Sequence, residues 1–505
     1  MPPADSAGSS NLEYVFSPRS MAVVGLSPDP HGTWLNKVYL QAPLNAGFKG
    51  PIYPVNLKGG HIGKLRVYPS LSDVPGPVDY VVSCVPAQHT LGLLEDCQVA
   101  GVKVVQLYTA GFSETGQGEG IELQNQLLEI ARRGRLRLIG PNCMGVYCPS
   151  SGMSFSLDFP KEPGNIGILC QSGGNAIYLI RSGAARGLRF SKAISYGNAC
   201  DLNECDILEY LAGDPETEVI AAYLEGTSNG KRLADVLAKA ASAKPVVIYK
   251  GGYTEAGSRA AASLTGAMAG SQAIWDGVIR QAGAIRVNSI EEMADMLMAL
   301  LRMKPPRGLN TCVVGVGGGA SVLATDELER SGLKLPPIPV SIQKRMQQII
   351  PPAGGMLRNP IDAFPLTGLI LRRQAAGASP SASVARGDKG WGDFISLIEE
   401  WQDIDLVVFQ FAFDIPPIPA GNWVAATIEP TLAAVKMCRL PSVVVFHSVV
   451  TDASWQASRR MQEICLVEGI PFFLSLRGAG QSICSLVDVS RTRWGGSARQ
   501  REWND

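Results

Sequence analysis

Short apolar runs rich in β-branched residues alternate along the chain with longer stretches of helical periodicity. The runs do not alternate apolar with polar positions, which is typical of strands buried on both faces of a parallel sheet. They form three successive groups, at 21–25, 51–55, 79–85, 102–108 and 136–140, then 165–170, 190–195, 219–224 and 244–250, then 311–316, 405–411 and 441–447. The clearest helical stretch between them is 119–133. This pattern predicts an α/β protein with three doubly wound parallel units.

The breaks between the groups predict the domain boundaries. We expect domains over residues 12–150, 160–302 and 308–490, because the proline- and glycine-containing segment MKPPRGLN at 303–310 interrupts the pattern. Within the last domain, residues 372–390 are small, polar and rich in Gly, Ser and Ala, which predicts a mobile loop.

Length and composition narrow the class of protein. The 505 residues are too many for one core, and 46% hydrophobic with 18% charged residues is typical of a globular chain. Lys+Arg and Asp+Glu both number 45, so no global charge attracts nucleic acid or anionic lipid. The sequence contains neither a run of 18 apolar residues nor a basic start followed by an apolar stretch. We therefore expect a cytoplasmic protein without membrane or nucleic-acid partners.

Cysteines and histidines indicate neither disulfides nor a metal centre. The 11 cysteines form no CxxC pair, which predicts reduced thiols. The four histidines, His31, His61, His89 and His447, lie far apart and lack metal-ligand spacing, so no metal site is predicted.

The first group of strands contains a candidate nucleotide site. Gly25-Leu26-Ser27 follows its first strand, where backbone N–H groups and a helix dipole favour an anion, although GxGxxG is absent and a plain tight turn remains an alternative. The second strand ends in Asn56-Leu57-Lys58, without the acid that accepts from the ribose of NAD. Lys58 instead suits a phosphorylated ribose, as in coenzyme A or NADP, unless it is only a solvated lysine.

Five segments of this region resemble the CoA-binding domain of the ADP-forming acyl-CoA synthetases and of the succinyl-CoA synthetase α subunit. They are VVGLSPDP (23–30), GFKGPIYPVN (47–56), YPSLSDVPGPVDYVVSCVPA (68–87), AGVKVVQLYTAGFSETG (100–116) and RLIGPNCMGV (137–146). The resemblance implies a Rossmann-like CoA-binding domain followed by two flavodoxin-like domains. It places nine residues near CoA: Gly25, Ser27, Asn56, Lys58, Val85, Pro86, Ala110, Gly111 and Asn142.

The second group of strands resembles the catalytic segments of the same family, with one departure. Cys170-Gln171-Ser172-Gly173-Gly174 matches an SQSG-type segment at a helix start, which implies that Ser172 and Gly173 face the phosphorylated group. Glu204 matches the acid that orients the catalytic histidine, although the acids at 201, 204 and 206 alone would also suit a solvated helix start. The histidine loop normally reads SHTG, whereas this chain reads Ser263-Leu264-Thr265-Gly266. Leu264 thus replaces the nucleophile and cannot carry phosphate.

The third group resembles the family's third α-subunit domain through TCVVGVGGGASVLATDELERSGLKLPPI and RNPIDAF. The run at 317–319 suggests a further nucleotide site, but turn geometry favours a structural role. Neither an ATP-grasp segment nor a P-loop GxxxxGK[ST] occurs. ATP or ADP with Mg²⁺ would therefore enter only through a partner chain, an ATP-grasp β-type subunit.

These observations leave three functions open. The first is the CoA-binding α-type subunit of an NDP-forming acyl-CoA synthetase-like complex that works without the usual phosphohistidine relay. The second is an acyl or carbamoyl transferase subunit, for which a phosphohistidine is unnecessary. The third is a pseudoenzyme that binds CoA or acyl-CoA as a scaffold. Each is compatible with a homo- or hetero-oligomer.

Overall fold

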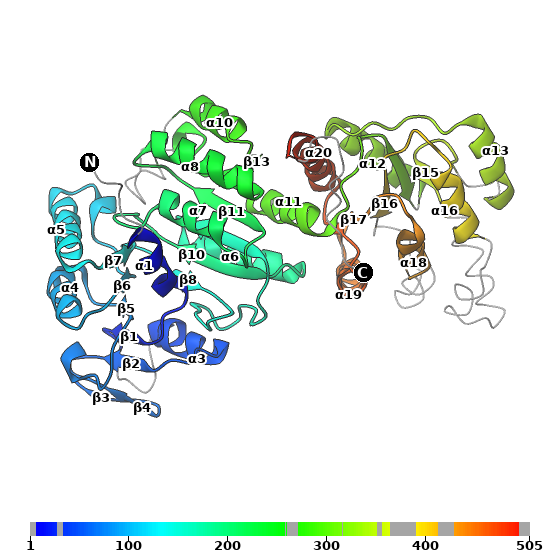
Figure 1. The fold of residues 1–505 in the computed structure, drawn as a ribbon. Helices are drawn as coiled ribbons and strands as arrows, with labels where there is room; N and C mark the ends of the chain where they lie inside the picture. Colours follow the sequence, from blue (N-terminus) through cyan, green and yellow to red (C-terminus); the bar gives the residue numbers. More distant parts are fainter. Residues whose placement is uncertain are drawn as a thin grey trace. The chain divides into compact units, whose positions relative to one another are not determined.

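Parallel sheets flanked by helices form the framework of the protein, as the computed structural model shows (Figure 1). It describes residues 7–27, 34–257, 259, 271–315, 317–350, 356–363, 390–412 and 429–493. The chain divides into two compact units, Met1–Met293 with two of the three main sheets and Ala294–Asp505 with the third. The predicted parallel α/β class is confirmed. All but the last residue of the predicted mobile loop 372–390 lie outside the described residues.

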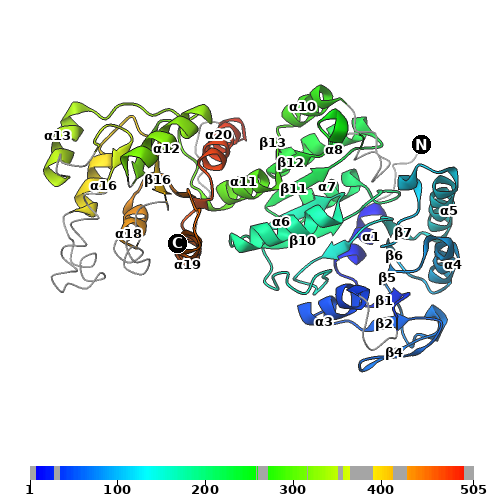
Figure 2. The same ribbon diagram turned by 180° about the vertical axis from the view of Figure 1, so that it is seen from behind.

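The first sheet has five parallel strands in the order β2-β1-β5-β6-β7. They are β1 (Met21–Val24), β2 (Ile52–Val55), β5 (Tyr80–Ser83), β6 (Val104–Leu107) and β7 (Arg137–Ile139). The helices are α1 (Ala7–Phe16), α2 (Trp34–Asn36), the π-helical turn η1 (Lys37–Gln41), α3 (Ala42–Ala46), α4 (Thr90–Val99) and α5 (Gly118–Gly134). A hairpin of β3 (Gly60–Ile62) and β4 (Leu65–Val67) lies outside the sheet, and α4 and α5 pack side by side in both views (Figures 1 and 2).

The second sheet has six strands in the order β13-β12-β11-β9-β10-β8. They are β8 (Gly145–Tyr147), β9 (Ile166–Cys170), β10 (Phe190–Ser195), β11 (Val219–Leu224), β12 (Val246–Lys250) and β13 (Ile285–Val287). Only β8 is antiparallel, paired with β10 at the edge. The helices are α6 (Gly173–Ala185), α7 (Glu204–Gly213), α8 (Gly230–Ala243), α10 (Gln272–Gln281) and α11 (Ile290–Arg302), and α7 packs against α8.

The third sheet, in the second unit, has five parallel strands in the order β15-β14-β16-β17-β18. They are β14 (Thr311–Gly315), β15 (Ile361–Asp362), β16 (Leu406–Ala412), β17 (Ser442–His447) and β18 (Phe472–Phe473). The helices are α12 (Gly318–Arg330), α13 (Val340–Ile349), α16 (Trp391–Glu399), α18 (Glu429–Met437), α19 (Asp452–Glu468) and α20 (Leu476–Arg493).

The three sheets share one topology. When the parallel strands of each sheet are counted along the chain, the spatial order is second, first, third, fourth, fifth. This is the flavodoxin-like order, in which the chain changes direction across the sheet between its first and third strands. Ligands of such sheets bind beyond the carboxyl ends of the strands at that point. The topology therefore directs attention to the loops after β1 and β5, after β9 and β11, and after β14 and β16.

Charged groups in and beside the second sheet are paired inside the fold. Lys192 and Asp214 have side chains only 5% and 6% exposed, with Nζ 2.9 Å from Oδ2, and Glu216 also accepts from the ammonium. Asp201, in the loop after β10, accepts from the guanidinium of Arg137 (Nε to Oδ2, 2.9 Å) and from the amide of Leu138 (2.8 Å). Asp201 therefore ties the second sheet to β7 of the first.

Candidate functional site

The nine residues predicted to contact CoA all lie in loops at one edge of the first sheet. Because its strands are parallel, their carboxyl ends meet at the same edge. Two follow each of four strands and one follows the last: Gly25 and Ser27 after β1, Asn56 and Lys58 after β2, Val85 and Pro86 after β5, Ala110 and Gly111 after β6, and Asn142 after β7.

Gly25 forms the turn after β1 in a conformation that favours glycine. Its φ is +95°, and its N–H donates to the Val55 carbonyl (2.9 Å). A Cβ at this position would lie 2.9 Å from the carbonyl carbon of Cys84. Real Cβ atoms do not approach backbone so closely, so the turn itself requires glycine.

Asn56 holds the loop after β1 from the neighbouring strand end. Its Nδ2 donates to the Leu26 carbonyl (2.8 Å), and its Oδ1 accepts from the Lys58 N–H (3.0 Å). Asn36 donates similarly to the Ser27 carbonyl (3.0 Å). Asn56 thus shapes the loop, whereas the side chain of Lys58 is exposed beside it.

Glu114 fills the turn after β6, a feature that the sequence analysis did not predict. Its carboxylate accepts from the N–H groups of Gly111 (2.5 Å) and Phe112 (3.1 Å). The side-chain amide of Asn198, in the loop after β10, donates to the same carboxylate (2.5 Å). A carboxylate therefore occupies the backbone donors of this turn, and it joins the loop that carries Ala110 to the second sheet.

The loop after β7 brings the two sheets of the first unit together at Asn142. This residue has φ +58°, and its N–H donates to the Thr109 carbonyl (3.1 Å). Thr109 in turn donates from Oγ1 to the Val85 carbonyl (2.6 Å). A Cβ at Gly197 would lie 2.2 Å from the Pro141 carbonyl oxygen, so the loop after β10 packs directly on this segment.

A pocket of about 370 Å³ joins residues from the two predicted sites. Its lining consists of Tyr108, Thr109, Ala110, Asn142, Cys143, Met144, Gly173 and Gly174. Ala110 and Asn142 were predicted to contact CoA, and Gly173 was predicted to face the phosphorylated group. The structure therefore places these three predicted residues around one cavity; we call it the junction pocket.

The start of α6 forms one wall of the junction pocket. Ser172 caps the helix, with its Oγ accepting from the Asn175 N–H (3.3 Å). A Cβ at Gly173 would lie 2.3 Å from Cγ of Met144, so glycine allows the helix to approach the loop after β7. The unpaired N–H groups of a helix start carry partial positive charge, which suits an acyl phosphate, a phosphate or a thioester oxygen.

Glu204 is not solvated, although its sequence context alone also suits a solvated helix start. It begins α7 with 2% exposure, and Thr227 donates from Oγ1 to its Oε1 (2.5 Å). Burial raises the pKa of Glu204 above its ordinary value of 4.5, against the lowering effect of the Thr227 hydrogen bond. The neighbouring acids are paired elsewhere, Asp206 with Arg232 (2.6 Å) and Asp201 with Arg137. Of the three acids, Glu204 is the buried one, and neither Arg137 nor Arg232 forms an ion pair with it.

The raised pKa gives a stability prediction for Glu204→Gln. A group with a raised folded-state pKa binds its proton more tightly in the folded state, so its contribution to stability falls as pH rises from about 4.5 through the folded pKa. The variant lacks this loss. We expect the unfolding free energy of the variant, measured with urea, to increase relative to that of the natural chain as the pH is raised from 5 to 7.5. A constant difference across this range would contradict the raised pKa.

Two buried charged residues of the second sheet were missed by the sequence analysis. Glu225 follows β11 and is 4% exposed, and Lys250 ends β12 and is 1% exposed. Burial lowers the pKa of Lys250, while the charge of Glu225 raises it, with a net lowering. Gln171, from the loop after β9, accepts from the N–H groups of Glu225 and Gly226 (3.0 Å to the latter). The sequence did contain a signal for both residues, because each is a charged residue at the end of an otherwise apolar strand.

Leu264 lies outside the residues that the structure describes. Among the residues that the structure does describe, no group of three or more His, Cys, Asp or Glu is arranged to hold a metal ion. None of the described helices combines the length and the apolar character that a membrane span requires.

Two family models match this chain. A CoA binding domain matches residues 19–149, and a succinyl-CoA ligase-like flavodoxin domain matches residues 163–300. These matches cover the first and second sheets, on either side of the junction pocket. The first unit is therefore that of a CoA-binding, succinyl-CoA-ligase-like protein.

Individual relatives define the family. The chain is 36% identical over 351 residues to the α subunit of ADP-forming acetate–CoA ligase II from Pyrococcus furiosus, covering 70% of this chain and 76% of that one. It is 33% identical to the ADP-forming 4-hydroxybutyrate–CoA ligase of Nitrosopumilus maritimus, covering 69% of this chain and 50% of that one. The solved dinucleotide-forming acetyl-coenzyme A synthetase 1 of Ca. Korarchaeum cryptofilum, in complex with phosphate and ADP, superposes with a TM-score of 0.75, 29% identity and coverage of 96% and 97%. The chain belongs to the family of ADP-forming acyl-CoA ligases, as the resemblance predicted.

Proposed function

We propose that this protein is the CoA-binding α-type subunit of an NDP-forming acyl-CoA synthetase-like complex that acts without the usual phosphohistidine relay. The junction pocket supports this proposal most directly, because it unites loops of the CoA-binding domain with the start of α6. Such a cavity suits a thioester or acyl phosphate whose carbonyl lies at the helix start while CoA runs along the edge of the first sheet.

The proposed roles follow from position. Gly25, Ser27, Val85, Pro86, Ala110, Gly111 and Asn142 border CoA, and Lys58 binds its ribose phosphate. Asn56 orders the loop after β1. Ser172 and Gly173 present the helix start to the reacting group, and Glu204 is the acid at the catalytic segment. We further propose three domains, 12–150, 160–302 and 308–490, in a cytoplasmic protein.

Leu264 excludes a phosphohistidine intermediate at the family's usual position. A leucine side chain has no lone pair, so no covalent phosphoryl group forms at this position. Nucleotide activation, with ATP or ADP and Mg²⁺, would come from an ATP-grasp β-type partner. The named relatives include ligases of acetate and of 4-hydroxybutyrate, so the acid itself differs within the family.

The leucine also favours a second function, transfer of an acyl or carbamoyl group between phosphate and another acceptor. That chemistry needs the CoA edge and the anion-binding helix start but no phosphohistidine. If no group is transferred at all, the protein would be a scaffold that binds acyl-CoA without turnover. Release of acyl phosphate from acyl-CoA and inorganic phosphate by the isolated chain would support transfer, and binding without release would support the scaffold.

The CoA assignment predicts selective stabilisation. At equal concentration, CoA is expected to raise the melting temperature more than NAD, because no acid is present for the NAD ribose, and more than NADP, because residues 19–149 match a CoA binding domain and the GxGxxG turn of dinucleotide sites is absent. At one hundred times its Kd, a ligand of the folded state adds about 2.7 kcal/mol. The measurement is a thermal-shift titration with the three ligands. An equal or reversed ranking would remove the CoA assignment.

Lys58→Ala provides the matched test of the phosphate contact. We expect the variant to lose about tenfold in affinity for CoA, in line with a charge-assisted contact, and to bind dephospho-CoA as the natural chain does. Arg66→Ala, on the nearby hairpin strand β4, serves as the control for general surface charge. Equal weakening by both substitutions would show that Lys58 is an ordinary surface lysine.

A further inference from the structure

Four polar side chains gather at one place in the third sheet, on a different unit from the residues assigned above. Gln410 lies near the carboxyl end of β16, His447 ends the neighbouring strand β17, and Ser448 follows it. Ser321, in the first turn of α12, completes the group. Because β14, β16 and β17 are parallel, the group lies at the edge of the sheet where ligands bind.

Gln410 is fixed beside the ring of His447. Its side chain is buried, and its Nε2 donates to Oγ of Ser321 (3.2 Å). A Cβ at Gly315, on the adjacent strand β14, would lie 1.8 Å from that nitrogen, so the glycine leaves room for the amide. The amide oxygen of Gln410 lies 2.5 Å from Nε2 of His447. Because this oxygen can only accept, Nε2 carries the ring hydrogen, and Nδ1 of the neutral ring has the lone pair.

The hydroxyl of Ser448 meets the other nitrogen of the ring. Its Oγ lies 3.1 Å from Nδ1 of His447, and both residues are partly exposed. Since the lone pair is on Nδ1, the hydroxyl donates and the imidazole accepts. The hydrogen bonds therefore run from a nucleophile through a base to a group that orients the base, which is the arrangement that activates a serine.

The backbone at Ser448 has a conformation that is rare for a serine. Its φ is +55°, in the left-handed region that residues other than glycine seldom adopt. The residue lies in the turn from β17 to α19, and α/β-hydrolases expose their nucleophilic serine on a strained turn from strand to helix. Phe446 and Val450 occupy the positions of the two glycines in the G-x-S-x-G pattern of those enzymes, so the sequence carries no such motif here.

The first turn of α19 holds Ser448 in this conformation. Oγ of Ser454 accepts from the N–H groups of Val450 (3.0 Å) and Thr451 (2.8 Å). In return, Oγ1 of Thr451 accepts from the N–H of Ser454 (3.2 Å). These reciprocal bonds fix the residues that follow Ser448, so the turn is pre-organised, as a strained nucleophile requires.

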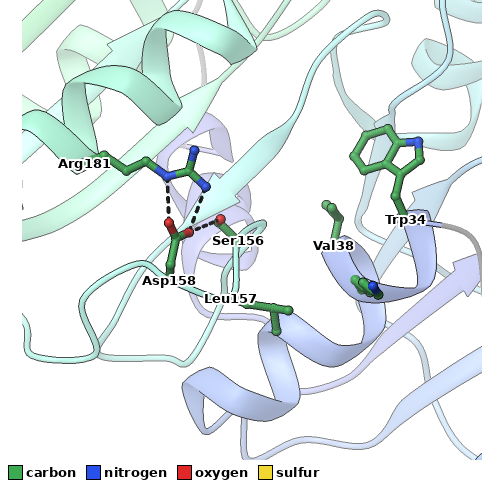
Figure 3. Close-up of a pocket in the computed structure, with 7 residues that line it drawn as sticks. Trp34, Val38, Ser156, Leu157, Asp158 and Arg181 are labelled. Atoms are coloured by element: carbon green, nitrogen blue, oxygen red, sulfur yellow. Dashed lines mark hydrogen bonds and ion pairs between the residues drawn. The ribbon is translucent and has the colours of Figure 1, made fainter.

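Ser156 of the first unit is a serine of similar exposure without such a base. It lines a hollow of about 320 Å³, and its hydroxyl donates to the carboxylate of Asp158 (2.5 Å), which pairs with Arg181 (Nε to Oδ2, 2.7 Å; Figure 3). Burial raises the pKa of Asp158, but the hydrogen bonds from Arg181 and Ser156 lower it below its ordinary value. This carboxylate is therefore a weak base, and Ser156 serves as the matched control for Ser448.

We propose that Ser448, His447 and Gln410 form a second catalytic site, at which the acyl group of an ester or thioester is transferred to Ser448 and then to water. First, Oγ of Ser448 bonds to the acyl carbon and its proton passes to Nδ1 of His447. The bond from that carbon to the leaving oxygen or sulfur breaks, and the leaving group takes the proton. Water then attacks the acyl-serine and gives a proton to Nδ1, and Oγ leaves and takes this proton back. Gln410 is a positioning residue, and no step depends on the CoA site.

Labelling of the full-length protein with a fluorophosphonate tests the proposal. An activated serine forms a bond from Oγ to phosphorus and displaces fluoride, and mass spectrometry of the digested chain locates the label. We expect label on Ser448 in the natural chain and in Ser156→Ala, and none on Ser156. His447→Gln is expected to label about 100-fold more slowly, in the range that a general base contributes. Hydrolysis of p-nitrophenyl acetate should follow the same order and be lost in Ser448→Ala.

Two substitutions of Gln410 test its role in orienting the ring. Gln410→Glu keeps an acceptor for the Nε2–H of His447, so it should label at least as fast as the natural chain. Gln410→Met lacks the acceptor and should label about tenfold more slowly, the range of one hydrogen bond to a charged group. A residue that only supports the fold would show equal slowing in both variants.

Two results would overturn the proposal. One is a folded natural chain in which Ser448 stays unlabelled, and the other is equal labelling of Ser448 in the natural chain and in His447→Gln. The second result would show that Ser448 is an ordinary accessible serine. Either result in a chain that still binds CoA would overturn the second site and leave the proposed function intact.

Discussion

Replacing Leu264 by histidine is expected to give a protein that takes up the phosphoryl group of labelled acetyl phosphate, whereas the natural chain takes up none. In this step the imidazole nitrogen forms a bond to phosphorus, the bond between phosphorus and the acyl oxygen breaks, and acetate leaves. Loss of a covalent nucleophile costs on the order of 10⁶-fold in rate, so restoring one should raise labelling at least about 10²-fold above the background signal of the natural chain, even with imperfect alignment. The measurement is acid-labile, base-stable label on the intact chain.

Two further variants make the result specific. Leu264→Asn supplies a polar side chain of similar size without a nucleophilic nitrogen and should remain unlabelled. Glu204→Gln combined with Leu264→His should label more slowly, because the buried carboxylate that would orient the imidazole is gone. A histidine variant that folds, binds CoA and stays unlabelled would show that the site no longer supports phosphoryl transfer. That outcome would favour the scaffold function.

Lys192→Ala is expected to destabilise the second sheet by about 3–5 kcal/mol. The substitution leaves the Asp214 carboxylate, 6% exposed, without its ammonium partner at 2.9 Å. Thr217 still donates to that carboxylate (2.6 Å), which does not compensate a buried charge. Burial lowers the pKa of Lys192, but the hydrogen bonds that its ammonium donates to Glu216 and Asp214 raise this pKa above its ordinary value, so the ammonium is charged when the pair forms. The measurement is urea-induced unfolding at neutral pH.

A double substitution distinguishes the effect of losing the ion pair from the effect of losing side-chain packing. Lys192→Met with Asp214→Leu removes both charges and keeps apolar volume, so it should recover much of the stability that the single variant loses. Arg330→Ala breaks an exposed pair with Glu327, whose side chains are 70% and 43% exposed, and should cost less than about 1 kcal/mol. A single-variant loss below this exposed control would show that the buried pair contributes nothing to folding.

The architecture was predictable because its strands are buried on both faces. The run 219–224 is apolar throughout and matches the observed strand β11, and the run 190–195 matches β10, which is buried along its whole length although three of its residues are polar or charged. The strands that were missed are short or lie at edges. β8 has three residues and β18 has two, while β13 carries Arg286 at its centre, which breaks the apolar run. Tertiary pairing, rather than local pattern, makes these segments into strands.

The position of a site residue could be predicted where it follows from the geometry of a single sheet. Contacts between loops of two different sheets could not be predicted. Loops such as those of Ala110 and Asn142 follow strands of one parallel sheet, so their common edge could be inferred. The contact of Asn198 with Glu114 joins residues 84 positions apart on different sheets, and the N–H of Glu225 meets Gln171 across 54 positions. No local pattern encodes such partners. The domain boundaries and the roles of the individual site residues remain predictions.

The strands of each of the three sheets lie within one continuous stretch of the chain, and these stretches do not overlap. The first sheet is complete at Ile139, the second at Val287 and the third at Phe473. A chain emerging from the ribosome can therefore close one sheet before the strands of the next have been translated, which limits the exposure of unpaired apolar strands. The salt bridge from Arg137 to Asp201 forms only after the loop that follows β10 has appeared. The lining of the junction pocket runs from Tyr108 to Gly174, so the pocket is completed only after the start of α6 has followed the finished first sheet out of the ribosome. A pause in translation between these two events would leave no strand of the first sheet waiting for a partner.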